Sequence, residues 1–165
     1  MEDFLSDHHI VAGIYPIADA FDTSKTTDWI CMNLYGGVAF LIKTGDATGN
    51  TANGVVTLLA ATDATGTGAT AFPFRYRVCA SSPTVDTWST PTVATASGFS
   101  MTPGDNVMYL CEVDAADVGA ALANANFVAL KVTEVTNDPI VADITAILSE
   151  PRFGSATPKT AITSV

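Results

Sequence analysis

The loop at residues 63–69, DATGTGA, has the small and hydroxylated residues of a phosphate-binding loop. A P-loop, however, needs the pattern GxxxxGK[ST] between a strand and a helix, with its lysine on the phosphates. This loop has no lysine, and the alternating residues 71–79 that follow it predict a strand. Gly66 and Gly68 allow the positive φ of a tight connection. We therefore interpret the loop as a turn between two strands.

Two groups of residues have the types that metal ions prefer. His8 and His9 are adjacent, so on a strand they point to opposite faces, and no cysteine pair at ligand spacing accompanies them. Asp46, Asn50 and Asn53 do not have the DxDxDG spacing and terminal Glu of a calcium loop, which favours a surface hairpin loop. The sequence predicts no metal site and no cofactor.

Catalytic patterns are equally weak. The chain has no GxSxG motif, and a Ser-His-Asp triad could use only the two histidines of the N-terminal segment. Glu112 and Asp114 share one strand face and are interpreted as a solvated pair. Trp29 and Trp88 could form a glycan-binding face, but core positions are favoured for such large aromatics. We expect a protein that is not an enzyme.

The cysteines, Cys31, Cys79 and Cys111, are odd in number, far apart and surrounded by apolar residues. This pattern fits neither a disulfide framework nor a zinc site. It favours buried, reduced thiols, and the alternative is a thiol that contacts or pairs with another subunit.

Composition limits the class of partner. The 165 residues fit one domain, and 17 acidic against 7 basic residues give a net charge of −10, which disfavours nucleic acid. No apolar run approaches the roughly 18 residues of a membrane span. The N-terminus, MEDFLSDHHI, lacks the basic start and apolar core of a signal peptide, so we expect synthesis in the host cytoplasm.

Apolar and polar residues alternate with a period of two along most of the chain. Such short runs, bounded by Gly, Asn, Asp and Pro, predict an all-β, antiparallel β-sandwich or a jelly-roll-like barrel. One short helix is predicted over 114–125, capped by Asp114 and weakened by Gly119. The predicted strands are 8–14, 28–34, 37–43, 54–62, 71–79, 106–113, 126–135 and 140–148, with a weaker one in 82–93.

The strand over 71–79 shows its two faces clearly. Phe72, Phe74, Tyr76 and Val78 are predicted to face the core. Pro73, Arg75 and Arg77 are predicted to point outward, and Pro73, which has no N–H, indicates that the strand begins there or lies at a sheet edge.

We divide the chain into an extended N-terminal arm (1–10), a sandwich domain (11–150) and a C-terminal tail (151–165). The tail has no core pattern, and an extended arm with Ile162 and Val165 can become ordered across a neighbouring subunit. The two arginines on one strand face either bind a partner or form local salt bridges. The candidate contacts with a partner or sister subunit are Phe4, Leu5, His8, His9, Arg75, Arg77, Arg152 and Phe153.

Several segments together resemble a group of small proteins encoded near the major capsid gene of tailed bacteriophages and prophages. These segments are IVAGIYPIADAFDTSKTTDWICMNLYGGVAFLIKTGDATG, VVTLLAATDATGTGATAFPFRY, YLCEVDAADV, FVALKVTEV and ILSEPRFG, of which ATDATGTGA and SEPRFG are the most telling. The resemblance implies a decoration, or cement, protein on the outside of the virion capsid, with the major capsid protein as its partner. It also implies a homo-oligomer, with a trimer favoured. The group has no cysteine pattern that explains the cysteines of this chain.

The sequence is also compatible with two other functions. A β-sandwich receptor- or glycan-binding module of a virion would have the same size and composition. A head–tail connector or tail component is the second alternative.

Overall fold

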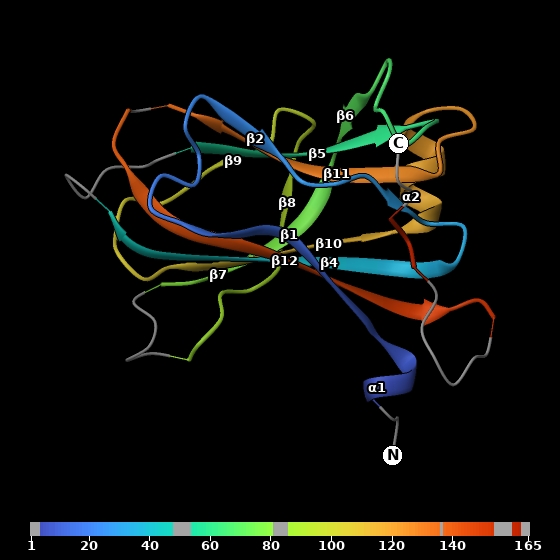
Figure 1. The fold of residues 1–165 in the computed structure, drawn as a ribbon, viewed down its shortest axis with the longest axis horizontal. Coiled ribbons are helices and arrows are strands. Elements are labelled where there is room, and N and C mark those ends of the chain that lie inside the picture. The colour runs from blue at the N-terminus through green and yellow to red at the C-terminus, as the bar shows by residue number, and fades with distance from the viewer. Residues whose placement is uncertain (1–3, 48–53, 81–85, 136, 154–159, 163–165) are drawn as a thin grey trace.

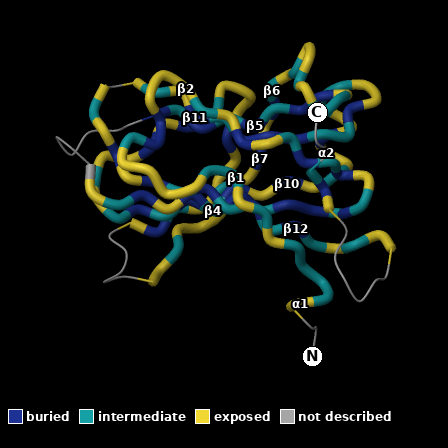
Figure 2. The backbone as a smooth tube through the Cα atoms, in the orientation of Figure 1, coloured by how far each residue is buried: buried dark blue, intermediate teal, exposed yellow. Residues whose placement is uncertain are grey.

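The computed structural model describes residues 4–47, 54–80, 86–135, 137–153 and 160–162. Two antiparallel β-sheets stack face to face (Figure 1), and the buried residues lie along the strands of both (Figure 2). One short helix, α2 (Ala115–Ala121), lies at one end of the stack, and a single helical turn, α1 (Phe4–Asp7), precedes the first strand. The predicted all-β sandwich is confirmed, and the described strands do not close into a barrel.

The first sheet, called the β4 sheet after its longest strand, holds six strands. Every pairing in it is antiparallel. Its order across the sheet is β1 (His9–Ile17), β12 (Ile140–Pro151), β4 (Tyr35–Ala47), β10 (Met108–Asp114), β7 (Phe74–Cys79) and β8 (Thr92–Ala94).

The second sheet, called the β5 sheet, is also antiparallel throughout. Its two long strands pair with each other at the centre, and short strands pair with their outer edges. Its order is β2 (Ser24–Thr26), β11 (Phe127–Glu134), β5 (Gly54–Ala61) and β6 (Thr70–Phe72), with β3 (Ile30–Cys31) on β11 and β9 (Phe99–Ser100) on β5.

The core follows from the alternation in the sequence. In β12, alternate residues from Ile140 to Leu148 are buried, and in β5 the same is true from Gly54 to Ala60. Aromatic rings connect the two sheets, because Tyr76 of β7 stacks on Phe99 of β9 with ring centroids 3.9 Å apart. Each fully buried Leu, Ile or Phe contributes about 1.5–3 kcal/mol to folding. Burial between the sheets therefore holds the sandwich together.

The chain changes sheets at Pro73. β6 ends at Phe72 in the β5 sheet, and β7 begins at Phe74 in the β4 sheet. Proline cannot donate to a ladder, so the break between strands falls where the sequence predicts it. Phe72 and Phe74 are buried, Tyr76 and Val78 are half-buried, and Pro73, Arg75 and Arg77 are exposed, which confirms the predicted faces.

Two predicted elements are shorter than expected. The strand over 28–34 is reduced to β3, because the chain leaves the β5 sheet after Cys31 and enters the β4 sheet at Tyr35. The helix over 114–125 ends at Ala121, because Leu122 is extended and Asn124 has a φ of 63°. Asp114 occupies the N-cap position without a side-chain capping bond, so the predicted cap is wrong.

The weaker strand in 82–93 is confirmed only in β8, which begins at Thr92, and residues 82–85 of that prediction lie outside the described residues. Asn50 and Asn53 of the rejected calcium loop, and Val165 of the C-terminal tail, also lie outside them.

The described parts of both terminal segments pack on the molecule. At the N-terminus, α1 contacts β12. Near the C-terminus, the N–H of Cys31 donates to the carbonyl of Ala161 at 2.8 Å, and Ile162 forms a bridge with Ile30. Residues 160–162 therefore extend the β5 sheet of their own chain. Among the described residues, no helix is long and apolar enough to cross a membrane.

Candidate functional site

In the 63–69 loop, the carboxylate of Asp63 accepts hydrogen bonds from other residues of the loop. Asp63 Oδ1 accepts hydrogen bonds from the Thr65 hydroxyl at 2.6 Å, the Thr65 N–H at 2.9 Å and the Thr67 N–H at 3.3 Å. The hydrogen bond from the Thr65 side chain is the main cause that lowers the pKa of Asp63, and the backbone bonds add to it. Gly66 and Gly68 have φ values of 72° and 67° in the β5–β6 connection. The turn interpretation is confirmed, because donors that could hold a phosphate already bind Asp63.

The histidines stack on different aromatic rings. His8 stacks on Phe4 with ring centroids 4.5 Å apart, and His9 stacks on Tyr35 at 6.0 Å. Within the part of the chain that the structure describes, no three His, Cys, Asp or Glu residues are grouped so as to hold a metal ion. The His9 stack thus connects the N-terminal segment to β4, whereas the His8 stack on Phe4 lies within that segment.

The cysteines form no disulfide, with Cys79 and Cys111 buried and Cys31 half-buried. Burial raises the pKa of the Cys111 thiol far above its usual value, so this group stays protonated. The prediction of buried, reduced thiols is confirmed for Cys79 and Cys111.

The tryptophans are half-buried, so the predicted core positions are wrong. Trp29 lies over the 63–69 loop, where its indole ring occupies the space that a side chain at Gly66 would need. Trp88 precedes β8.

Six of the eight candidate contact residues lie near the ends of β1, β4 and β12. Phe4 and Leu5 are on α1, which contacts β12, and Leu5 is 80% exposed. The backbone N–H and Nε of Arg152 donate to the carbonyls of Leu34 and Tyr35, at 2.9 and 3.4 Å. His9 stacks on that same Tyr35, and Phe153 is exposed. A polar cavity of about 330 Å³ lies beside them, lined by Asp7, His8, Ser149, Glu150 and Pro151.

The first strand, β1, forms one edge of the β4 sheet and pairs only with β12 among the described strands. Its register is regular from His9 to Ala12, and two register shifts then follow before Ile17. Exposed strand edges invite pairing, and bulges restrict it. Residues 4–17 carry five of the nine large hydrophobic side chains that are exposed among the described residues, namely Phe4, Leu5, Ile10, Tyr15 and Ile17.

The two arginines lie inside the same sheet. Arg75 and Arg77 are on β7, between β10 and β8, and both are exposed. Arg75 Nη2 forms a salt bridge with Glu112 Oε1 at 2.7 Å, whereas Arg77 forms no ion pair with any described residue. The local salt bridge that the sequence left as an alternative is therefore present for one arginine and absent for the other.

Strand register places these arginines on the same surface as the apolar N-terminal strand. We call this surface the outer face of the β4 sheet and define it by two cross-strand rows. One row runs through Ile10, Ile147, Ala39, Glu112 and Arg75. The next runs through Ala12, Thr145, Leu41, Leu110 and Arg77.

The outer face changes character from one end to the other. Ile147, Leu41 and Leu110 are half-buried and form an apolar middle. Ile10 continues this surface to the β1 edge, and on the other side the arginines lie on β7, where Arg75 pairs with the exposed Val93 of the edge strand β8. Four strand spacings separate β1 from β7, a distance of about 19 Å. The sequence identified both ends of the face but not its apolar middle, because the half-buried residues of β4 and β10 read as ordinary strand positions.

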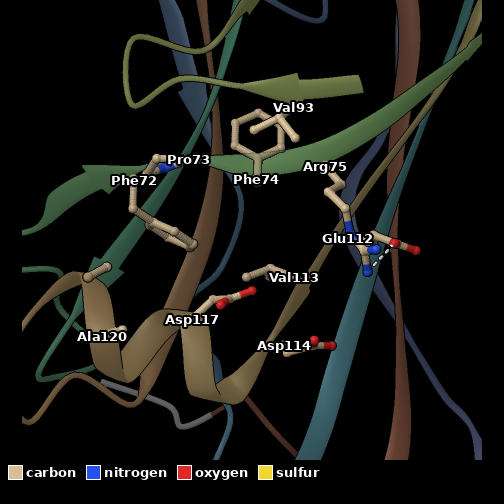
Figure 3. A pocket seen from close by; sticks show the side chains of 11 residues that line it. Phe72, Pro73, Phe74, Arg75, Val93, Glu112, Val113, Asp114, Asp117 and Ala120 are labelled. Atoms are coloured by element: carbon tan, nitrogen blue, oxygen red, sulfur yellow. Dashed lines mark ion pairs between the residues drawn. The ribbon is translucent and has the colours of Figure 1, made fainter. Parts of the chain in front are cut away.

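A second feature that the sequence did not reveal is a cavity of about 570 Å³ beside α2 (Figure 3). Phe72, Phe74 and Val93 lie along one side of it, and the carboxylates of Glu112, Asp114 and Asp117 lie along the other. Its residues come from three segments that the sheet change at Pro73 brings together. Nothing in their spacing along the chain indicates this proximity.

No family model and no curated protein matches this chain. Among solved structures, the chain is similar to SPBc2 prophage-derived protein YomS, with 12% identity and a TM-score of 0.43 over 86% of this chain and 92% of that one.

Proposed function

We propose that this protein is a virion structural protein that binds the outside of a phage capsid and stabilises contacts between capsomers. The outer face of the β4 sheet is the observation that carries the proposal. An antiparallel sheet face exposed to water normally carries polar residues, but here Ile10, Leu41 and Leu110 occupy it. Apolar surface that stays partly open to solvent in a folded domain indicates contact with another macromolecule.

The shape of the face favours a broad, rigid partner. Its six strands form one continuous sheet surface, and a broad surface of this kind suits a protein lattice better than a small substrate. Arg77, which has no ion-pair partner among the described residues, provides a charged contact at one end. The exposed side chains of residues 4–17 extend the contact beyond the other end.

Many copies acting together would make even modest contacts effective. A protein that binds the assembled lattice and not the free subunits stabilises the lattice by mass action. When several copies are linked in one oligomer, binding of one copy raises the effective concentration of the others at the lattice and so strengthens overall binding. We infer that the partner is the major capsid protein and that the protein acts as a homo-oligomer, with a trimer favoured. The resemblance of ATDATGTGA and SEPRFG to phage head proteins supports this partner, and we propose no enzymatic activity.

The test is binding of the purified protein to expanded empty heads built from the cognate capsid protein, with bound copies counted by mass spectrometry. We expect hundreds of copies in fixed ratio to capsid subunits and heads that resist higher temperatures. A few copies per head would support a connector or tail component instead. No binding to heads, together with binding to a glycan array, would support a receptor-binding module.

A matched pair of variants locates the contact. Ile10→Asp places a charge on the outer face, and Val135→Asp places one at a similarly exposed apolar position after β11, with exposed fractions of 56% and 63% in the native protein. If Ile10 is buried against the capsid in the complex, the loss of this contact should weaken head binding about tenfold or more. Val135→Asp should bind as the native protein does. Equal binding by both variants would contradict the assignment of the outer face.

A further inference from the structure

The 570 Å³ cavity has two chemically different sides (Figure 3). The rings of Phe72 and Phe74 and the side chain of Val93 form the apolar side. The acidic side is formed by β10 and the first turn of α2, which contribute Asp114 and Asp117. The volume lies within the range of about 300–1,000 Å³ that ligand sites usually have.

The charges in the cavity do not cancel. One guanidinium, that of Arg75, faces three carboxylates, and its 2.7 Å salt bridge with Glu112 neutralises one of them. Asp114 makes no capping bond to α2. Neither Asp114 nor Asp117 forms an ion pair with a described residue. Two carboxylates are thus available for a ligand without any loss of contacts that hold the fold.

We infer that this cavity receives a basic side chain, Arg or Lys, from a segment of a partner protein. The long aliphatic stem of such a side chain can lie along Phe72, Phe74 and Val93 while its charged end reaches the two carboxylates. An acidic or phosphorylated segment would be repelled, because the only guanidinium of the cavity already pairs with Glu112. The inference concerns this cavity alone and does not require that the outer face bind a capsid.

The experiment titrates the full-length, ¹⁵N-labelled protein with the capped peptide Ac-Leu-Arg-Leu-NH₂. A second titration uses the same peptide with citrulline, which is a neutral analogue of arginine. We expect the arginine peptide to shift the amide signals of residues 72–75 and 112–117 and the citrulline peptide to bind several-fold more weakly. Equal shifts with both peptides, shifts confined to other residues, or no shifts would overturn the inference.

Variants then test the two carboxylates. Asp114→Asn/Asp117→Asn should weaken binding of the arginine peptide by about three- to tenfold, since two exposed ion pairs are lost. The control Asp22→Asn changes a charge in the exposed β1–β2 connection and should leave the affinity unchanged. An unchanged affinity in the double variant would overturn the inference. Head binding is measured separately, so failure here and failure of the proposed function are distinguishable.

Discussion

The outer faces of the two sheets carry different side chains at corresponding positions. On the β5 sheet, one cross-strand row consists of Ser24, Thr133, Val55 and Ser100, and the next consists of Thr26, Lys131 and Thr57. On the β4 sheet, the corresponding rows contain Ile10 and Ile147 in one and Leu41 and Leu110 in the other.

These two rows of the β5 sheet, in which Val55 is the one apolar residue, follow the usual rule that the solvent face of an antiparallel sheet is polar, and the next row, with Leu59 and Ala71, is apolar. The β4 sheet departs from this rule, although both sheets bury equally regular inner faces. Folding alone does not require the apolar outer residues, because they add nothing to the core between the sheets. The difference therefore favours the β4 sheet as the binding side of the molecule and the β5 sheet as the side that faces solvent.

The largest expected effect comes from damage to the core that both faces share. Phe40 is fully buried on β4, and Phe40→Ala should lower the free energy of unfolding by about 3–5 kcal/mol. Urea denaturation measures this loss. Head binding should fall together with the folded fraction. Normal head binding by a largely unfolded Phe40→Ala variant would mean that neither face acts as a folded surface.

Substitution of two glycines in the β5–β6 turn should lower stability without changing the outer face of the β4 sheet. Gly68→Ala should cost about 1–2 kcal/mol, because its φ of 67° disfavours a side chain while the space around it is open. Gly66→Ala should cost about 1–3 kcal/mol more, because the added methyl group would collide with the Trp29 indole.

Thermal and urea denaturation of the two glycine variants measure the difference. Both should bind heads normally at a temperature where they are folded, since the turn belongs to the β5 sheet. Equal destabilisation would show that the Trp29 contact is unimportant, and loss of head binding would show that the β5 sheet also contacts the partner.

A leucine on each outer face gives the most direct comparison. Leu41 on β4 and Leu59 on β5 are both half-buried and both point away from the core. Leu41→Lys and Leu59→Lys should each change stability by about 1 kcal/mol. Only Leu41→Lys should weaken binding in the head sedimentation assay. Equal binding by the two variants would remove the distinction between the faces.

Much of the fold could be predicted because period-two alternation and turn residues act locally. The pattern of 140–148 gives both the strand β12 and its buried face, and Pro73 marks the break between β6 and β7. The strand predicted over 28–34 is too long. These residues alternate like a strand, although the chain leaves one sheet and enters the other within them. Alternation predicts which residues face inward but not where a ladder ends.

The candidate site could be predicted only in part. Exposed residues such as Leu5 and Arg77 could be identified from the sequence, because charge and a terminal position are local properties. The alignment of Ile10 with Arg75 depends on the register of five strands, which no single segment contains. The cavity beside α2 depends likewise on the crossing at Pro73.

The smallest expected effect concerns pH and the β5 side. The folded-state pKa of Asp63 lies below its ordinary value of 3.8, mainly because the Thr65 hydroxyl donates to the carboxylate. Its contribution to stability is therefore complete above that ordinary value and is lost as the pH falls through the lowered pKa. Asp63→Asn keeps the shape of the side chain but removes the charge. The melting temperature of the variant should be slightly lower than native at neutral pH, and the difference should shrink in strong acid. A difference that stays constant with pH would show that the Thr65 and Thr67 hydrogen bonds do not depend on an ionised carboxylate.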